Sequence, residues 1–399
     1  MDALTTPLPK AWQRVRLGDI AEIIGGGTPS TQITSFWNGS INWFTATEIG
    51  ITKYVYKSQR TITPLGLKKS SAKLLPIGTI LLTSRASIGD CAILKVVATT
   101  NQDFQSLIPL EKINNEFLYY LMLTLKNKLL KLASGSIFLG VSPNKIKNLL
   151  IPLPPLNEQI AIANVLSDVD RYLYSLDALI LKKESVKKAL SFELLSQRKR
   201  LKGFNQAWQR VRLGDICEFG NGGAYETLIV ENGNFKLISL NSIDIDGNLK
   251  NTMKRVNFYD NSLKQDDIVM VLSDVAHGDF LGLCAVIPSN DYVLNQRMGR
   301  LRKKNDCINI LFLRLYINAN QKYFKMQGQG SSQLNLSKKA IEDFEIPLPP
   351  LNEQIAIANI LSDVDHEIIS LKNKKRQFEN VKKALNHDLM SAKIRVLNK

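Results

Sequence analysis

Apolar residues recur at alternating spacings of three and four along residues 157–202 and again along residues 352–399, and neither stretch contains Pro or Gly. This pattern is typical of helices that bury one stripe against a partner helix. It predicts two helices, each about 35–40 residues long. The first stripe comprises Leu166, Val169, Leu173, Leu176, Ile180, Lys183, Lys187, Leu190 and Leu194, and the second comprises Leu361, Val364, Ile368, Leu371, Lys375, Phe378, Lys382, Leu385 and Leu389.

The segment IPLPPLNEQ precedes each predicted helix, at residues 151–159 and 346–354. Proline is tolerated just before the first turn of a helix but not in its interior. The asparagines of this segment, Asn157 and Asn352, are predicted N-caps. The glutamate after each of them places a carboxylate at the positive end of the helix dipole.

Short strand-like runs dominate the two remaining blocks of the chain. Residues 77–95 and residues 266–287 each predict two strands around a turn. Helical stretches follow at residues 116–132 and 308–326, and Gly/Ser loops come next at residues 134–136 and 328–332. The pattern predicts α+β domains, each with a sheet and peripheral helices.

The chain repeats itself at an offset of about 195 residues. AWQRVRLGDI occurs at residues 11–20 and again at 207–216. Residues 151–170 recur at 346–365 with one change, Val165 to Ile360. VKKAL also recurs, at residues 186–190 and 381–385, whereas the blocks between these constant segments diverge. The layout therefore alternates variable and constant parts, which suggests a fixed scaffold that carries two copies of one domain.

Two equal helices favour pairing with each other, although one amphipathic helix lying on a globular core would show the same stripe. Antiparallel pairing with a domain at each end is expected, because parallel pairing would require the second domain to thread between the helices. The prediction is an α+β protein with an internal pseudo-two-fold repeat. It has four parts: variable domain 1 (residues 1–150), constant region 1 (151–204), variable domain 2 (205–345) and constant region 2 (346–399).

Lys and Arg outnumber Asp and Glu by 52 to 36, which gives a formal charge of +16 and favours a polyanionic partner. Residues 171–204 and 366–399 each hold nine basic and three acidic residues, so most of the excess lies in the predicted helices. Such a helix face is either simply solvated or faces DNA phosphates or an acidic partner. No run of 18 apolar residues and no signal-peptide pattern occurs, so no membrane association and a cytoplasmic location are expected.

No motif of catalytic or cofactor chemistry is evident. There is neither a G-x-x-x-x-G-K-[ST] phosphate loop nor an N/D-P-P-Y/F block of the kind that amino-methyltransferases use. The triple glycine at residues 25–27 is expected to form a strand and turn without a nucleotide. The three histidines, His277, His366 and His387, are too scattered for a metal cluster. The four cysteines are isolated, so we expect small buried residues rather than disulfides.

Several motifs together carry a family resemblance. They are GGGTPS…FWNGSINWFTATEI within residues 25–49, ILLTSRASIG at 80–89, TNQDFQSLIP at 100–109, a Gly/Ser loop, and then IPLPPLNEQ with a long helix. In this order the chain resembles the specificity subunit of type I restriction–modification enzymes, over essentially its whole length. The second variable block departs from the pattern, because Gly222-Gly223-Ala224 lacks the Thr-Pro and Trp that follow in the first. Its target sequence is therefore unpredictable.

The resemblance implies a non-catalytic subunit with two target-recognition domains. Such a subunit binds a bipartite site on double-stranded DNA, recruits two methyltransferase subunits, and can also recruit restriction subunits that act as motor and nuclease. No cofactor is expected in this chain. S-adenosylmethionine, ATP and Mg are expected in the partner subunits.

Base recognition requires side chains such as Arg for guanine and Asn or Gln for adenine, and phosphate binding requires cations. The candidate DNA contacts are Lys68, Lys69, Lys73, Arg85, Asn101, Gln102, Lys254, Arg255, Asn295, Gln296, Arg297 and Arg300. The Asn-Gln pair occurs in both variable domains, although these should recognise different sequences. This favours a structural or phosphate-binding role for the pair. Each lysine taken singly is also compatible with an ordinary surface charge.

The near-identical constant blocks are candidates for binding two identical partner subunits. The candidate partner-binding residues are Asn157, Glu158, Gln159, Asn352, Glu353 and Gln354. Two other functions stay open from the residues alone. One is a coiled-coil adaptor that joins other proteins without binding DNA. The other is a stand-alone nuclease or methyltransferase, which the missing motifs disfavour.

Overall fold

The computed structural model describes residues 8–134, 139–275 and 278–396. These residues form two compact units, and each unit joins one variable domain to half of each constant helix. Unit 1 contains residues up to Ala178 together with residues from Asn373 onward, and unit 2 contains Leu179–Lys372. The boundary between the units therefore falls within the helices.

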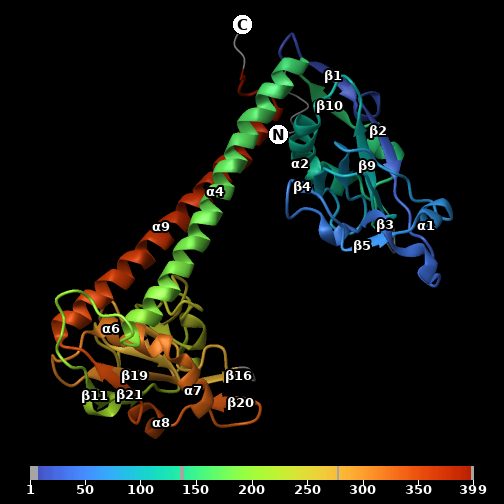
Figure 1. The fold of residues 1–399 in the computed structure, drawn as a ribbon. Coiled ribbons are helices and arrows are strands. Elements are labelled where there is room, and N and C mark those ends of the chain that lie inside the picture. The colour runs from blue at the N-terminus through green and yellow to red at the C-terminus, as the bar shows by residue number, and fades with distance from the viewer. Residues whose placement is uncertain (1–7, 135–138, 276–277, 397–399) are drawn as a thin grey trace. The chain divides into compact units, whose positions relative to one another are not determined.

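Unit 1 contains a five-stranded sheet in the order β2-β9-β6-β7-β4 and a three-stranded sheet in the order β5-β3-β8 (Figure 1). A separate pair, β1-β10, closes the start of the domain onto its end. The strands are β1 Gln13–Arg16, β2 Ala21–Gly25, β3 Trp37–Phe44, β4 Tyr54–Val55, β5 Arg60–Ile62, β6 Ile80–Leu82, β7 Cys91–Leu94, β8 Ala98–Thr100, β9 Gln105–Pro109 and β10 Leu150–Leu153, and the helices are α1 Pro64–Lys68, α2 Asn115–Leu132 and α3 Pro143–Lys147.

Unit 2 repeats this topology without a counterpart of β4, with sheets in the orders β12-β19-β15-β17 and β14-β13-β18 and a closing pair β11-β21. It adds the short pair β16-β20. The strands are β11 Gln209–Arg212, β12 Cys217–Asn221, β13 Phe235–Ile238, β14 Lys254–Val256, β15 Ile268–Val271, β16 Ser273–Val275, β17 Cys284–Val286, β18 Tyr292–Leu294, β19 Met298–Lys303, β20 Gln333–Asn335 and β21 Glu345–Leu348, and the helices are α5 Leu213–Ile216, α6 Ile310–Ala319, α7 Gln321–Gln327 and α8 Lys338–Glu342.

The strand registers give a residue-by-residue correspondence between the two variable domains. Ile80 pairs with Leu107 in the first, as Ile268 pairs with Leu301 in the second. The main-chain nitrogen of Asn101 donates to Phe44 of β3 at 3.0 Å, and that of Asn295 donates to Ile238 of β13 at 2.9 Å. This correspondence holds where the sequences share little identity, and it allows equivalent loop positions to be compared.

The two strand pairs predicted from the sequence are confirmed, as β6 with β7 and as β15 with β17. The predicted helix 116–132 is α2, but the single helix predicted over 308–326 is wrong. It is divided into α6 and α7 at Asn320, whose side-chain amide donates to the carbonyl of Tyr316 at 2.8 Å. Three cysteines are buried as expected, whereas Cys307 is exposed.

The two constant helices are α4 (Leu156–Leu195) and α9 (Leu351–Met390), each 40 residues long. Each helix begins at the leucine before the asparagine, so Asn157 and Asn352 lie in the first turn and the N-cap prediction is wrong. The predicted stripes are confirmed, since each of their eighteen residues is buried or half-buried.

Ion pairs along the stripes establish the antiparallel direction within each unit. In unit 1, Asp170 pairs with Lys382 at 2.5 Å and Asp177 with Lys375 at 2.6 Å. In unit 2 the pairs are Lys183–Glu367, Lys187–Asp365 and Glu184–Lys372, at 2.7, 2.5 and 2.7 Å. The four lysines that interrupt the apolar stripes are thus neutralised by the opposite helix. Part of the basic charge of the helices is used inside the pair.

The helices also belong to the core of the domain that each one holds. In unit 1, Leu166 of α4 and Leu389 of α9 share a buried cluster with Phe117 of α2. In unit 2, Leu194 and Leu361 share a cluster with Phe312 of α6. Because the cores are continuous, each variable domain is held rigidly on its helix pair.

Asp170 should be more important for stability than its repeat partner Asp365. Asp170 is 8% exposed and accepts hydrogen bonds from the Tyr120 hydroxyl and from Lys382, both at 2.5 Å. Asp365 is half-buried and pairs with Lys187. We expect Asp170→Ala to destabilise unit 1 by about 2–3 kcal/mol, because it leaves the buried Tyr120 hydroxyl and the half-buried Lys382 without their acceptor. We expect Asp365→Ala to cost unit 2 about 1 kcal/mol.

Hydrogen exchange of α2 and α6 measures the two losses separately, since each helix lies in the core of one unit. If Asp365→Ala reduced the protection of α6 as much as Asp170→Ala reduces that of α2, Asp170 would not be the more important residue for stability.

Candidate nucleic-acid interface

Three segments of variable domain 1 meet at one end of its five-stranded sheet, around Arg85. The nitrogen of Ser84 donates to the carbonyl of Asp103 at 2.7 Å, and the nitrogen of Val141 donates to the carbonyl of Ser84 at 2.9 Å. Arg85 itself is exposed, and the next residue, Ala86, has a φ of 40°. This conformation is costly for a residue other than glycine and is often retained at functional sites.

The same junction in variable domain 2 carries different side chains. The nitrogen of Leu272 donates to the carbonyl of Arg297 at 3.0 Å, and that of Leu336 donates to Leu272 at 2.8 Å. Arg297 is exposed and has a φ of 69°. The strand pair β16-β20 then places Gln333 and Asn335 beside this junction. Sequence reasoning missed these two amides, although they directly follow the predicted Gly/Ser loop.

The Asn-Gln pair divides into a buried and an exposed member in both domains. Asn101 is 8% exposed and donates to Asp103 at 2.8 Å, and Asn295 is 1% exposed and donates to Glu226 at 2.8 Å. Gln102 and Gln296 are exposed. The burial of the asparagines supports their structural role and leaves the glutamines as candidate contacts.

The glycine run at 25–27 is explained by close packing. A Cβ atom at Gly26 would lie 1.9 Å from the carbonyl oxygen of Asn101, and one at Gly27 would lie 2.4 Å from the nitrogen of Ala72. Thr28, directly after the run, donates its hydroxyl to Gln102. The run therefore serves to bring the chain against the Asn-Gln turn.

The basic candidates differ in how free their charges are. Lys68, Lys69 and Lys73 are exposed on and after α1. Lys254 is exposed and pairs with Glu226 at 3.4 Å. These four remain candidates for phosphate contacts.

Arg255 and Arg300 are half-buried and committed to contacts inside unit 2. Arg255 donates to the carbonyl of Gly233 at 3.0 Å. Arg300 bonds to Glu218 at 2.7 Å and to the carbonyl of Ser262 at 3.2 Å. These contacts stabilise the sheet, so the structure gives both side chains an internal role.

Four of the six predicted partner-binding residues have buried side chains. Glu158 and Gln159 are 2% and 1% exposed, and Glu353 and Gln354 are both 0% exposed. They offer no accessible surface to a partner. A partner subunit that binds this block can contact only the exposed neighbours of these four residues.

Each of the two glutamates joins the residue just before the first strand of its unit to the segment that follows the opposite constant helix. Glu158 accepts from the Trp12 indole at 3.0 Å and from two nitrogens of Arg395 at 2.5 and 3.0 Å. Glu353 repeats this with the Trp208 indole at 3.1 Å and with Arg200 at 3.1 and 2.6 Å. A bidentate guanidinium and an indole together give both oxygens of the buried carboxylate a hydrogen-bond donor.

The glutamines fasten the constant helix to the domain. Gln159 accepts from the nitrogen of Asn114, the N-cap of α2, at 2.9 Å and donates to Lys112 at 3.1 Å. Gln354 bonds in the same way to Asn309, the N-cap of α6, and to Cys307 at 2.8 and 2.9 Å. The contacts of these glutamates and glutamines within each unit thus explain why the segment IPLPPLNEQ is the same in both repeats.

The exposed part of the repeated block is a stripe on the first turns of each constant helix. Leu156 and Ile160 are 46% and 42% exposed in unit 1, and Leu351 and Ile355 are both 40% exposed in unit 2. Asn157 and Asn352 are exposed beside them. Two equivalent helices thus present the same small apolar surface.

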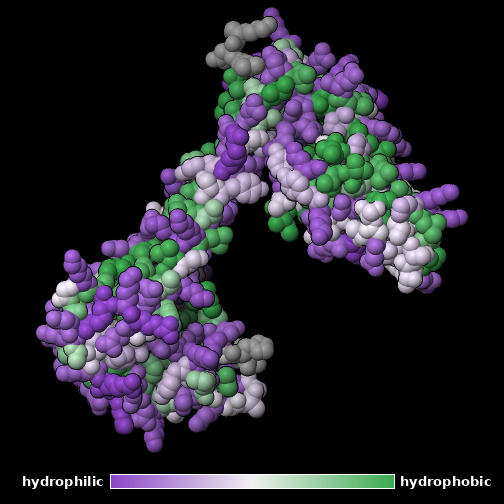
Figure 2. Space-filling model, viewed as in Figure 1, coloured by the Kyte–Doolittle hydropathy of each residue, from purple (hydrophilic) through white to green (hydrophobic). Residues whose placement is uncertain are grey.

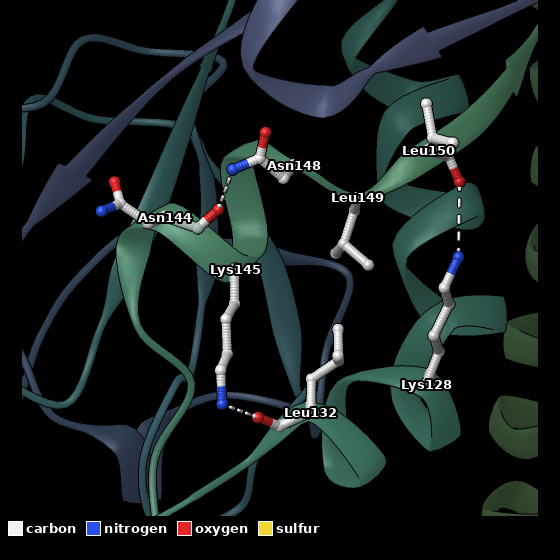
Figure 3. Close-up of a pocket in the computed structure, with 7 residues that line it drawn as sticks. All are labelled: Lys128, Leu132, Asn144, Lys145, Asn148, Leu149 and Leu150. Atoms are coloured by element: carbon white, nitrogen blue, oxygen red, sulfur yellow. Dashed lines mark hydrogen bonds between the residues drawn. The ribbon is translucent and has the colours of Figure 1, made fainter.

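A pocket of 420 Å³ lies between α2 and α3 in unit 1. Its two lysines turn inward to carbonyls: Lys128 donates to Leu150 at 3.5 Å, and Lys145 donates to Leu132 at 2.9 Å (Figure 3). In unit 2 the repeat places Tyr323 and Phe344 at two of the lining positions, with ring centroids 4.8 Å apart. The pocket therefore reflects smaller side chains in variable domain 1.

Within the described ranges, no group of three or more His, Cys, Asp or Glu residues could hold a metal ion. His277 lies outside the described residues, as do Gly135 and Ser136 of the predicted loop. No described helix combines the length and apolarity needed to cross a membrane. Hydrophilic residues predominate on the face of unit 2 seen in Figure 2.

The fold and its repeat are shared with proteins of one class. Residues 9–183 and 205–380 each match the family model of the type I restriction modification DNA specificity domain. Together these matches cover most of the chain. The protein therefore belongs to the type I restriction–modification specificity family.

Named relatives come from archaea and bacteria. The MjaIX specificity subunit of Methanocaldococcus jannaschii is 41% identical over 167 residues, which are 41% of this chain and 39% of the relative. The EcoR124I/EcoR124II specificity subunit of Escherichia coli is 36% identical over 39% of this chain and 40% of its own length. These two matches thus span about two fifths of each relative. The MjaVIII subunit is 28% identical over 98% of this chain and 95% of the relative.

Solved structures share the fold over nearly the whole chain. The S subunit of the type I restriction–modification system from M. genitalium has a TM-score of 0.60 and 20% identity, covering 96% of this chain and 98% of that one. The HsdS subunit from Thermoanaerobacter tengcongensis has a TM-score of 0.54 and 18% identity, covering 98% and 99%.

Removing Arg395 should destabilise unit 1 and leave unit 2 largely unaffected. Glu158 is buried, so loss of its guanidinium partner leaves a carboxylate held only by Trp12. We expect Arg395→Ala to cost about 3–5 kcal/mol in the stability of unit 1. The matched variant Arg200→Ala should cost unit 2 a similar amount. Limited proteolysis in a denaturant series, with the cut sites mapped, distinguishes the units, and loss confined to the wrong unit would refute the assignment.

Proposed function

We propose that this chain is the DNA-recognition subunit of a type I restriction–modification enzyme and has no catalytic site of its own. The observation that carries the proposal is the duplicated junction. Each variable domain holds an exposed arginine on a left-handed or strained turn, Arg85–Ala86 or Arg297, at the same junction of the fold but at different positions within it. Membership of the DNA specificity family supports it.

The two junctions carry different side chains on equivalent backbones, as expected for domains that recognise different half-sites. The proposed target is therefore bipartite double-stranded DNA, one half for each variable domain. The net charge of +16 and the exposed Lys68, Lys69 and Lys73 favour phosphate contacts that position the domains.

The proposed protein partners are two methyltransferase subunits and, in the restricting enzyme, motor and nuclease subunits. The chain presents the stripe of Leu156 and Ile160 a second time as Leu351 and Ile355, and equal surfaces suit equal subunits. One solved relative comes from a study of assembly of the type I restriction–modification system. In this proposal S-adenosylmethionine, ATP and Mg belong to the partners, and the complex acts in the cytoplasm.

DNA binding should be both steeply salt-dependent and sequence-dependent. We expect the affinity of the complex for its target to fall by at least about 10³-fold between 50 and 200 mM salt if six or more phosphates are contacted. It should exceed the affinity for unrelated duplexes by at least about 10³-fold. Fluorescence anisotropy at several salt concentrations measures both quantities. A protein that only joins other proteins would show no preferred sequence.

The two apolar stripes should each hold one methyltransferase subunit. We expect Leu156→Glu/Ile160→Glu to remove one subunit from the complex, and the further changes Leu351→Glu/Ile355→Glu to remove both. Leu181→Glu is the matched control, since Leu181 is 64% exposed on α4 outside the repeated block. Native mass spectrometry of the co-expressed proteins gives the stoichiometry. Full complexes with all four changes would exclude this surface.

A further inference from the structure

The geometry points to guanine recognition by guanidinium groups at two non-equivalent positions, Arg85 in variable domain 1 and Arg297 in variable domain 2. The inference rests on the proposed function and names the residues that determine specificity. It implies that the two half-sites carry their contacted guanine at different places relative to the domain.

The equivalence of the junctions is set by main-chain bonds. Ser84 donates to Asp103 as Leu272 donates to Arg297. Gly89 donates to Thr83 at 2.9 Å as Gly282 donates to Val271 at 2.9 Å. Position 85 therefore corresponds to Ser273, and position 103 corresponds to Arg297.

The arginine has changed places between the two domains. Variable domain 1 has Arg85 on the loop after β6 and Asp103 in the turn before β9. Variable domain 2 has Ser273 at the first position and Arg297 at the second, before β19. Each junction thus holds one guanidinium. In variable domain 1 it comes from the donor segment of the shared main-chain hydrogen bond, and in variable domain 2 it comes from the acceptor segment.

Both guanidinium groups are available to a ligand. Arg85 and Arg297 are exposed, and among the described residues neither has an acidic partner in an ion pair. By contrast, Arg300 and Arg302 in the strand that follows Arg297, β19, pair with Glu218 and Asp267 at 2.7 and 2.6 Å. A planar guanidinium donates to guanine O6 and N7 together, the commonest specific contact in the major groove.

The side chains next to position 85 also differ between the two domains. A Cβ atom at Gly140 would lie 3.3 Å from Cγ of Arg85, so glycine leaves room for the long side chain. The equivalent of Gly140 is Asn335, which pairs with Ser273 across β16-β20. The neighbouring Gln333 donates to the Ser273 hydroxyl at 2.5 Å. In variable domain 2 amides fill the place that the guanidinium has in variable domain 1.

The test selects bound sites from a randomised double-stranded DNA library with the full chain in complex with its methyltransferase subunits. The wild-type complex should select two half-sites. Arg85→Ala should reduce the preference for guanine at one position of one half-site by about 5- to 150-fold, and Arg297→Ala should do the same in the other half-site only. Arg171→Ala is the control, since this arginine is 79% exposed on α4, and it should leave both half-sites unchanged.

A third variant tests the exchange itself. The double change Arg85→Ser/Asp103→Arg should move the guanine preference to another position of the same half-site. Asp103 bonds to Asn101, so this variant is also checked by circular dichroism, and the single alanine variants decide the inference if it is unfolded.

Three results would overturn the inference. Arg85→Ala or Arg297→Ala could select the wild-type sites, or could weaken binding uniformly over all sequences, as loss of a phosphate contact does. Either of these leaves the proposed DNA recognition intact. A wild-type complex that selects no sequence would overturn the proposed function and this inference together.

Discussion

Each half of the molecule depends on one buried carboxylate. Glu158 and Glu353 lie in the first turn of a constant helix, and each binds an indole from just before the first strand and a guanidinium from the segment after the opposite helix. Leaving either carboxylate without its cation is costly in a water-excluded site, so three distant segments are held together by one group. The sequence of the sheet and its loops can differ between the two domains because these contacts of the glutamate are the same in both.

Much of the scaffold could be predicted because its signals are periodic or repeated. The three–four spacing located the two helices, and every residue of the stripes it predicted is buried or half-buried, while the repeat identified the two domains. The strand pairs were visible as apolar runs around a turn. The break at Asn320 was not visible, because a side-chain bond to the preceding turn leaves the apolar pattern intact.

The constant block was harder to interpret. A glutamate at a helix start is equally compatible with a dipole contact at the surface and with a buried ion pair. Its partner Arg395 lies 237 residues away, which no local pattern indicates. A signal was present, however, because Arg200 and Arg395 repeat at the same offset as the glutamates. Repetition of charge at both ends of an element indicates a contact more strongly than charge at one end.

The variable domains fill the remaining space against the helices in different ways. In unit 1 the buried Lys53 donates to Tyr120 and Ser167 at 2.9 Å each, and Tyr120 bonds to Asp170. In unit 2 the corresponding cation is the half-buried Arg314, whose pKa is lowered by desolvation and which donates to the carbonyl of Gly247 at 2.9 Å.

In both units this cation comes from the variable domain, whereas the aspartate and lysine of the helix pair, Asp170–Lys382 or Asp365–Lys187, are constant. A domain placed on the other helix pair would therefore bring its own cation and meet the same charges. The two constant helices present the same charged residues to each variable domain, and each domain contacts them with its own side chains. This arrangement lets recognition loops diverge without a compensating change in the helices.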